Sequence, residues 1–167
     1  MRNPIYGSNE FDSGAYGSVG KIVHVTPASD GTGVAAAESV ILTAADSGNR
    51  YFVNVSANTA SFRLPSASSN KGAMFHFHAD ILSDAEATKA MIVFTDATDE
   101  FIIGTCLDAG VIHDSSVADD QIKLDGGGGA LAGGDRVSVV CDGAHWYITE
   151  AVSLTAATWV SGTISRS

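Results

Sequence analysis

The fold is decided by one stretch near the C-terminus, Gly134-Asp135-Arg136-Val137-Ser138-Val139-Val140-Cys141-Asp142-Gly143-Ala144-His145-Trp146-Tyr147-Ile148-Thr149. The apolar positions with a period of two are Val137, Val139 and Cys141, and then Trp146 and Ile148. Such alternation is typical of a half-buried strand, and Asp142-Gly143 is a strong signal for a tight hairpin turn. The stretch therefore predicts a β-hairpin with Trp146 in the core.

Short β-type runs separated by turn residues continue this pattern toward the N-terminus and the C-terminus. The runs are 22–25, 40–42, 51–55, 62–64, 73–79, 91–94, 101–103, 121–124 and 159–164. Many short strands at near-regular spacing predict an all-β fold, an antiparallel β-sandwich or small barrel of jelly-roll-like character. The length favours one β domain over 21–167. Only 83–90 is compatible with a helix, of two turns, and a polar loop fits it equally well.

Residues 1–20 differ from the remainder of the chain. Glycine and proline at positions 4, 7, 14, 17 and 20 disfavour a helix or a long strand. The segment also carries four large apolar residues, Ile5, Tyr6, Phe11 and Tyr16. These are more anchors than a solvated tail needs, so we predict an extended N-terminal arm that binds a partner through them. The alternative is a frayed tail with incidental aromatic residues.

Composition excludes several kinds of partner. The 167-residue chain is 45% apolar and 17% charged, and its formal net charge of -10 repels phosphate backbones and anionic membranes. The nine basic residues are scattered singly. We therefore expect no nucleic-acid partner and no membrane partner. A weakly charged surface rich in small residues instead favours packing against other subunits. The start of the chain lacks an apolar core of the signal-peptide kind, so we expect synthesis and assembly in the cytoplasm.

Two segments carry a resemblance to a known class of proteins. Upstream lie Leu42-Thr43-Ala44-Ala45-Asp46-Ser47-Gly48-Asn49-Arg50-Tyr51-Phe52-Val53-Asn54 and Phe62-Arg63-Leu64-Pro65-Ser66-Ala67. Together with the hairpin stretch they resemble segments of structural proteins from tailed bacteriophages, over roughly residues 40 to 150. Tail fibre, tail tip and head surface proteins all carry versions of this pattern. The resemblance implies a virion building block without enzymatic activity.

Combined with the arm, the resemblance leads us to expect a capsid decoration (cement) protein on the outer capsid surface of the virion. It would form a homotrimer, and its arms would staple neighbouring subunits of the major capsid protein, with strength gained through multivalency. The alternative is a tail fibre or tail tip module that binds carbohydrate or a receptor. Its stacking platforms would be Trp146, Tyr147 and Trp159. A small hydrolase is a third hypothesis, and a closed pocket with a perturbed pKa would favour it.

Few residues stand at the sequence spacings that are typical of metal-binding or catalytic sites. His76 and His78 project from one face of a strand and form half of a transition-metal site at most, with His24, His113, His145 and Asp80 as remote candidates for further ligands. The acidic residues at 96–100, 114, 119, 120 and 125 do not match a calcium-loop spacing. Cys106 and Cys141 fit buried thiols, and a disulfide between them is the alternative. We predict no catalytic residue, no metal, no cofactor and no small-molecule substrate.

Overall fold

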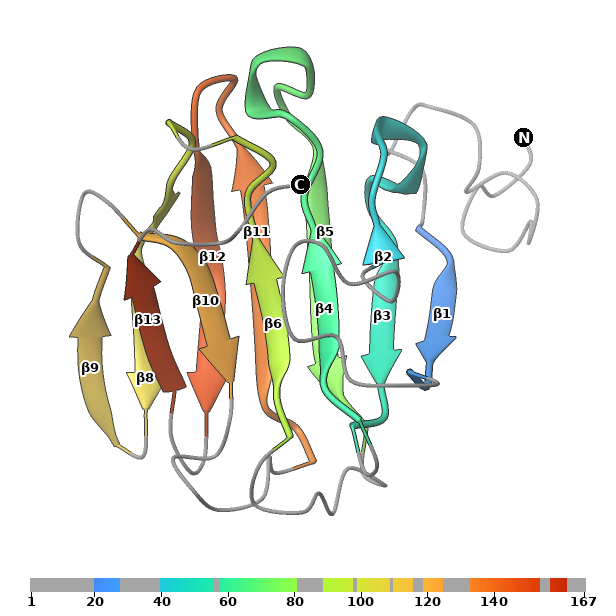
Figure 1. The fold of residues 1–167 in the computed structure, drawn as a ribbon, viewed down its shortest axis with the longest axis vertical. Helices are drawn as coiled ribbons and strands as arrows, with labels where there is room; N and C mark the ends of the chain where they lie inside the picture. Colours follow the sequence, from blue (N-terminus) through green and yellow to red (C-terminus); the bar gives the residue numbers. More distant parts are fainter. Residues whose placement is uncertain are drawn as a thin grey trace, which may run out of the picture.

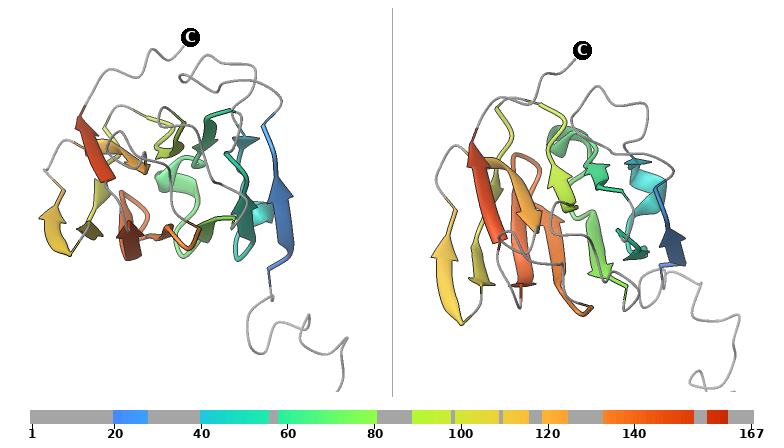
Figure 2. Two further views of the ribbon diagram at one scale, coloured as in Figure 1. Left: turned by 90° about the horizontal axis from the view of Figure 1, so that it is seen from below. Right: turned by 60° about the horizontal axis from the view of Figure 1, so that its bottom comes forward.

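A computed structural model of the chain describes residues 20–27, 40–55, 58–80, 89–97, 99–108, 110–115, 119–124, 133–153 and 157–161. Within these ranges the chain forms strands, joined in two places by a single 3-10 turn. The strands build two sheets that lie one in front of the other (Figure 1). Seen from below and tilted, the sheets form two separate layers (Figure 2). The predicted all-β sandwich is confirmed.

The strands and 3-10 turns follow one another without a long helix. Their bounds are β1 Ile22–Val25, β2 Val40–Ile41, η1 Ala44–Asp46, β3 Arg50–Val53, β4 Ala60–Arg63, η2 Ala67–Ser69, β5 Met74–Ala79, β6 Met91–Phe94, β7 Ile102–Ile103, β8 Thr105–Asp108, β9 Val111–Asp114, β10 Asp119–Leu124, β11 Arg136–Cys141, β12 Trp146–Ser153 and β13 Ala157–Ser161. In the part of the chain that the structure describes, no helix is long and apolar enough to cross a membrane.

The larger sheet has the strand order β1-β3-β5-β11-β12-β8-β9, with β7 also paired to β12. The smaller sheet has the order β13-β10-β6-β4-β2. From β1 to β6 the chain passes from one sheet to the other at every step, so odd-numbered strands enter the larger sheet and even-numbered strands the smaller one. Among β1 to β6, two strands that are neighbours in one sheet are therefore separated by one full turn of the chain around the core.

This winding corrects the prediction of purely antiparallel, jelly-roll-like pairing. Six of the eleven strand pairs run parallel, among them β1 with β3, β3 with β5, β2 with β4 and β4 with β6. The turn at Asp46-Ser47-Gly48-Asn49 has hairpin chemistry, yet it joins β2 of the smaller sheet to β3 of the larger one. Parallel neighbours cannot be joined by a tight hairpin and need a crossover connection, which the other sheet supplies here. Turn residues alone do not distinguish this crossover from a hairpin.

The hairpin expected over residues 137–149 is present as β11 and β12. Val137 pairs with Ala151, and Cys141 pairs with Trp146, in antiparallel register. Trp146 is fully buried, as predicted, and its ring lies against that of Phe75. The inward side chains of both sheets form one core, to which Phe62 and Phe77 contribute rings 4.8 Å apart.

One hairpin of the structure was not predicted from the sequence. Two predicted features, the helix-compatible segment and the N-terminal arm, lie almost entirely outside the described residues. Strands β8 and β9 pair antiparallel around Gly110, whose φ of 88° is typical of a tight turn, and this glycine was the available signal. The helix-compatible segment lies outside the described residues up to residue 88, and residues 1–19 of the predicted arm lie outside them as well. Gly20, the last residue of the predicted arm, already packs on the domain, since a Cβ there would lie 1.6 Å from the Gly48 carbonyl oxygen.

Candidate functional site

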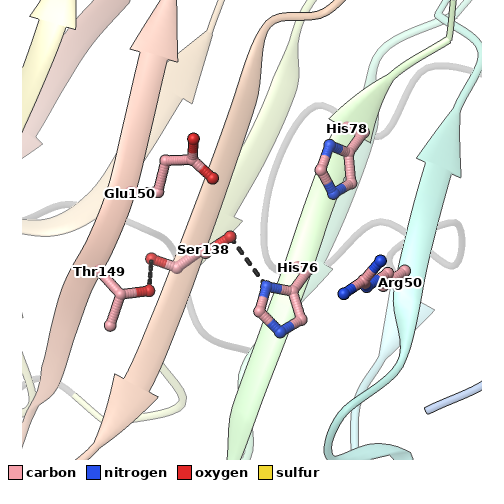
Figure 3. A pocket seen from close by; sticks show the side chains of 6 residues that line it. All are labelled: Arg50, His76, His78, Ser138, Thr149 and Glu150. Atoms are coloured by element: carbon pink, nitrogen blue, oxygen red, sulfur yellow. Dashed lines mark hydrogen bonds between the residues drawn. The ribbon is translucent and has the colours of Figure 1, made fainter. Parts of the chain in front are cut away.

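The outer face of the larger sheet contains an open depression of about 490 Å³. Figure 3 shows the six side chains that line it, which come from four adjacent strands. They are Arg50 of β3, His76 and His78 of β5, Ser138 of β11, and Thr149 and Glu150 of β12. We call this site the basic depression, because one guanidinium and two imidazoles border it and only one carboxylate does.

Strand alternation places the two histidines. In β5 the side chains of Phe75 and Phe77 are fully buried between the sheets, while His76 and His78 are half-buried on the outer face. The prediction that both imidazoles share one face is confirmed. Parallel pairing with β3 then sets Arg50 opposite His76 in the register, which brings a residue from a distant part of the chain to the histidines.

A second row of rings borders the basic depression. Strand β3 sets Phe52 between His24 of β1 and His78 of β5, with ring centroids 5.6 Å and 5.3 Å apart, respectively. Both pairs are stacked, so the two faces of the Phe52 ring are covered by imidazoles. Three of the five histidines of the chain therefore lie on this one face.

A β-bulge shapes the opposite side of the depression. Ser138 pairs with Glu150 but Val139 pairs with Ile148, so Thr149 is an extra residue in β12. Because of this extra residue, Thr149 and Glu150 are both exposed although they are neighbours in the strand. Figure 3 shows both side chains on the side of the sheet that carries the histidines.

Hydrogen bonds engage most polar groups of the site. The Ser138 hydroxyl lies 2.9 Å from His76 Nδ1, and the Thr149 hydroxyl donates to the Ser138 carbonyl oxygen over 3.3 Å. Arg136, which pairs with His78 in the register, donates through Nε to Glu150 over 2.5 Å. Glu150 is therefore already neutralised by a guanidinium, whereas the Arg50 guanidinium has no carboxylate within ion-pair distance among the residues that the structure describes.

The electrostatic surroundings keep both histidines neutral near pH 7. Burial lowers the pKa of His76, and the nearby positive charge of Arg50 lowers it further. Burial also lowers the pKa of His78, followed by the effect of His76. Glu150 acts in the opposite direction on both imidazoles but does not outweigh burial. At neutral pH the positive charge of the basic depression thus resides mainly on Arg50.

The contact between Ser138 and His76 meets the first requirement for a nucleophilic serine, a hydroxyl within hydrogen-bond distance of a base. Two features of the site oppose that use. Ser138 is only 3% exposed, and Arg50 beside the imidazole lowers the pKa of His76 and so weakens it as a base. The depression is open to solvent and is bordered by the Arg50 guanidinium and by the N–H groups of two imidazoles. These groups are better suited to binding an anion than to activating a hydroxyl.

The remaining histidines do not join this site as ligands. His24 lies 4.0 Å from Asp80, His113 lies 3.6 Å from Asp108, and His145 stacks on Phe101. Among the described residues, no group of three or more histidine, cysteine or acidic side chains is arranged to hold a metal ion.

The acidic runs have structural partners in the described ranges. Asp96 pairs with Arg63 at 3.4 Å. Glu100 is buried and accepts hydrogen bonds from the Ala67 amide at 2.7 Å and the Ser66 hydroxyl at 2.8 Å, where it caps the start of η2. Both carboxylates therefore have partners within the fold.

Cys106 and Cys141 are free, buried thiols, and no disulfide joins them. Burial raises the pKa of Cys106 to about 11, and burial likewise raises the pKa of Cys141. A reactive cysteine has the opposite property, a lowered pKa. Both side chains are therefore packing residues of the core.

The residues predicted to bind partners divide into two groups. Ile5, Tyr6, Phe11 and Tyr16 lie outside the described residues, and so does the side chain of Trp159. Of the stacking platforms suggested for a tail module, Trp146 is fully buried and Tyr147 is 37% exposed. Trp146 thus has no surface to offer a ligand.

The segment around Ala67 packs against the end of strand β11 at Cys141. Cys141 Sγ lies 3.3 Å from the Ala67 carbonyl oxygen and donates to it, and the Gly72 amide donates to the Cys141 carbonyl oxygen over 2.8 Å. The Asp142-Gly143 turn follows directly and faces the side chain of Lys71. Segments that are far apart in the sequence therefore form one packed unit.

Sequence reasoning singled out His76 and His78 but missed Arg50, Arg136 and Glu150. Nothing in the sequence near each of these charged residues marks it, since ordinary exposed strand positions also carry such side chains. Their association depends on the register of β3, β5, β11 and β12. Comparison with protein-family models and with curated proteins finds no match for this chain.

Proposed function

We propose that the protein is a non-enzymatic structural component of a bacteriophage virion, and specifically a decoration protein on the outer capsid surface. In this proposal it forms a homotrimer and joins neighbouring subunits of the major capsid protein, with residues 1–19 reaching the adjacent subunit. It is made and assembled in the host cytoplasm and needs no cofactor.

The contact between Cys141 and Ala67 carries the proposal. The segments around Ala67 and around Cys141 share hydrogen bonds and a common core. This packing supports the proposal, because it joins the two runs that carry the resemblance in one packed unit of the fold.

Exposed apolar side chains at the sheet edges give further support. Ile22 of β1 is 65% exposed, Ile41 of β2 is 59% exposed and Ile112 of β9 is 69% exposed. These three strands end their sheets in the described strand order. An edge strand with apolar side chains is prone to pair with another chain. Such edges suit a subunit that functions within a larger assembly.

The alternative is a tail fibre or tail tip module that binds carbohydrate. Burial of Trp146 removes the strongest of its stacking platforms, and Tyr147 remains as the partly exposed one. No contact of the described residues favours a tail location over the capsid surface.

The test uses phage particles prepared with and without this protein. We expect particles without it to release their DNA at a lower temperature, measured with a DNA-binding dye during heating, and to adsorb to host cells at an unchanged rate. Adding the purified full-length protein should restore the release temperature, and electron microscopy should locate it on the head. Unchanged release temperature with lost adsorption would contradict the capsid role and support the tail alternative.

A further inference from the structure

Basic groups gather on one face of an acidic protein. The chain has 19 acidic and nine basic residues, yet the outer face of β1, β3, β5 and β11 brings together His24, Arg50, His76, His78 and Arg136. Within the described ranges, the carboxylates in contact with this group are Glu150, which is bound to Arg136, and Asp80, which lies 4.0 Å from His24. Arg136 and Glu150 compensate each other, so Arg50 is left as the cation of this face without a carboxylate partner among the described residues, and such a cation on an otherwise acidic surface attracts anionic groups.

Arg50 is the residue of this face best placed to bind an anion. Its guanidinium is exposed, it borders the depression beside both imidazoles, and it has no carboxylate partner among the described residues (Figure 3). A guanidinium presents paired N–H donors that match the two oxygens of a carboxylate. The group that would complete Arg50 is therefore an oxyanion.

The charge of the depression selects a singly charged oxyanion. With both imidazoles neutral at pH 7, Arg50 supplies one uncompensated positive charge. Neutral imidazoles can still donate one N–H each. Glu150 on the opposite side is compensated by Arg136, so the charge of Arg50 balances one negative charge on a ligand. A carboxylate meets these conditions better than a phosphate dianion does.

The surroundings of the depression favour a protein over a saccharide as the source of the carboxylate. Phe52, the aromatic ring next to His78, is covered on both faces by His24 and His78, so it offers no stacking surface to a sugar. The same outer face carries Met74 and Tyr147, both 37% exposed, and Ile22 beside Arg50 in the register. Arginine, methionine and aromatic residues are the types enriched at protein interfaces.

We propose that the basic depression docks an acidic segment of a partner protein, with a ligand carboxylate bound by Arg50 and flanked by the imidazole N–H groups of His76 and His78. The proposal rests on the assembly role proposed above in one respect, which is that the partner is a protein. The occupant is defined by its chemistry, an Asp- or Glu-containing stretch with neighbouring apolar residues that contact Met74 and Tyr147.

The test measures binding of fluorescein-labelled hexaglutamate to the full-length protein by fluorescence anisotropy at low ionic strength. Arg50→Gln should weaken binding about tenfold, as expected when a charge-assisted hydrogen-bonded pair is removed. Arg63→Gln is the matched control, because it removes the same charge from the smaller sheet. It should leave the affinity unchanged. Arg50→Lys keeps the charge but loses the paired donors, so it should give an intermediate affinity.

Labelled hexagalacturonate and inorganic phosphate are the competing probes. Tighter binding of hexagalacturonate than of hexaglutamate would overturn the proposal in favour of an acidic saccharide, and stronger binding of phosphate would overturn the choice of a carboxylate. Equal losses in Arg50→Gln and Arg63→Gln would show a general effect of net charge and would also overturn it, as would the absence of binding by all three probes. Circular dichroism of each variant verifies the fold.

The outcome of this binding experiment is independent of the outcome of the particle experiment. Hexaglutamate binding that depends on Arg50 supports the docking site even if particles without the protein prove equally heat-resistant. Loss of capsid stability without any hexaglutamate binding would support the decoration role and overturn the docking site.

Discussion

The ring of Trp146 on β12 lies 5.6 Å from the ring of Phe75 on β5, at an interplanar angle of 45°, and both side chains are fully buried between the sheets. Strand β11 separates β5 from β12 in the larger sheet, so this contact spans the antiparallel part of the sheet. It joins the hairpin to the strand that carries the histidines.

Replacement of Trp146 by alanine should therefore destabilise the fold by about 3–5 kcal/mol, because it opens a cavity beside Phe75. Urea denaturation followed by circular dichroism measures the change. The neighbouring substitution Tyr147→Ala is the control, and it should cost much less because Tyr147 is 37% exposed. Equal losses in the two variants would mean that Trp146 is not a core residue.

A side chain at Gly143 in the Asp142-Gly143 turn should destabilise the folded protein. This residue has a φ of 101°, which L-residues rarely adopt, and a Cβ there would lie 3.4 Å from the Lys71 side chain. We expect Gly143→Val to lower the free energy of unfolding by about 1–2 kcal/mol through backbone strain. Chemical denaturation tests this, with Ala144→Ser at the adjacent exposed position as the control. A neutral Gly143→Val would contradict the assigned turn.

Acidification should weaken the fold through His76 and His78. Burial lowers the pKa of both imidazoles in the folded state; Arg50 adds to the effect on His76, His76 adds to the effect on His78, and Glu150 opposes both shifts. The unfolded chain, with a histidine pKa of about 6.5, then binds more protons than the folded chain over the interval between the two pKa values. This contribution is complete above the unfolded pKa and is lost as the pH falls through the folded pKa.

The melting temperature measured between about pH 8 and about pH 5 tests this linkage. We expect the double variant His76→Gln, His78→Gln to lose less stability over this range than the unmodified protein. An identical pH dependence in the two proteins would assign the effect to other groups.

Neither thiol should react in the folded protein. Cys106 is fully buried with a pKa raised to about 11, and Cys141 is 3% exposed and donates to the Ala67 carbonyl oxygen. The thiolate is the reactive form, so both burial and the raised pKa suppress modification. Ellman's reagent should titrate no thiol at pH 8 and two thiols after denaturation in urea. Rapid reaction under native conditions would contradict the packing of the affected cysteine.

Deletion of residues 1–19 should leave the β domain folded and weaken attachment to the particle. The first described strand begins at Ile22, and the contact of Gly20 with Gly48 stays in place in this truncation. We expect an unchanged β-type circular dichroism spectrum and thermal transition, together with reduced binding in a particle sedimentation assay. Unfolding of the truncated protein would show that the segment belongs to the domain.

The strands could be predicted from local sequence patterns, because the alternation of side chains along a strand depends only on residues that are neighbours in the sequence. The alternation that buries Phe75 and Phe77 also exposes His76 and His78, and this result needs no knowledge of the partner strand. The Asp142-Gly143 turn is similar, because the glycine conformation and the flanking apolar positions are all local. The β8–β9 hairpin carried a weaker local signal at Gly110, and it was missed.

The sequence by itself determined the all-β class, the β11–β12 hairpin and the face on which the side chains of β5 lie, because a period of two and turn chemistry are written in adjacent residues. Only the tertiary structure decided that strands β1 to β6 alternate between sheets and pair in parallel within each sheet. It also decided that Arg50 lies beside His76 and that Glu150 lies beside Arg136. These contacts depend on the register between strands that are far apart in the sequence, and that register is set by how the two inner faces fill a common core, a property that no local stretch of residues encodes.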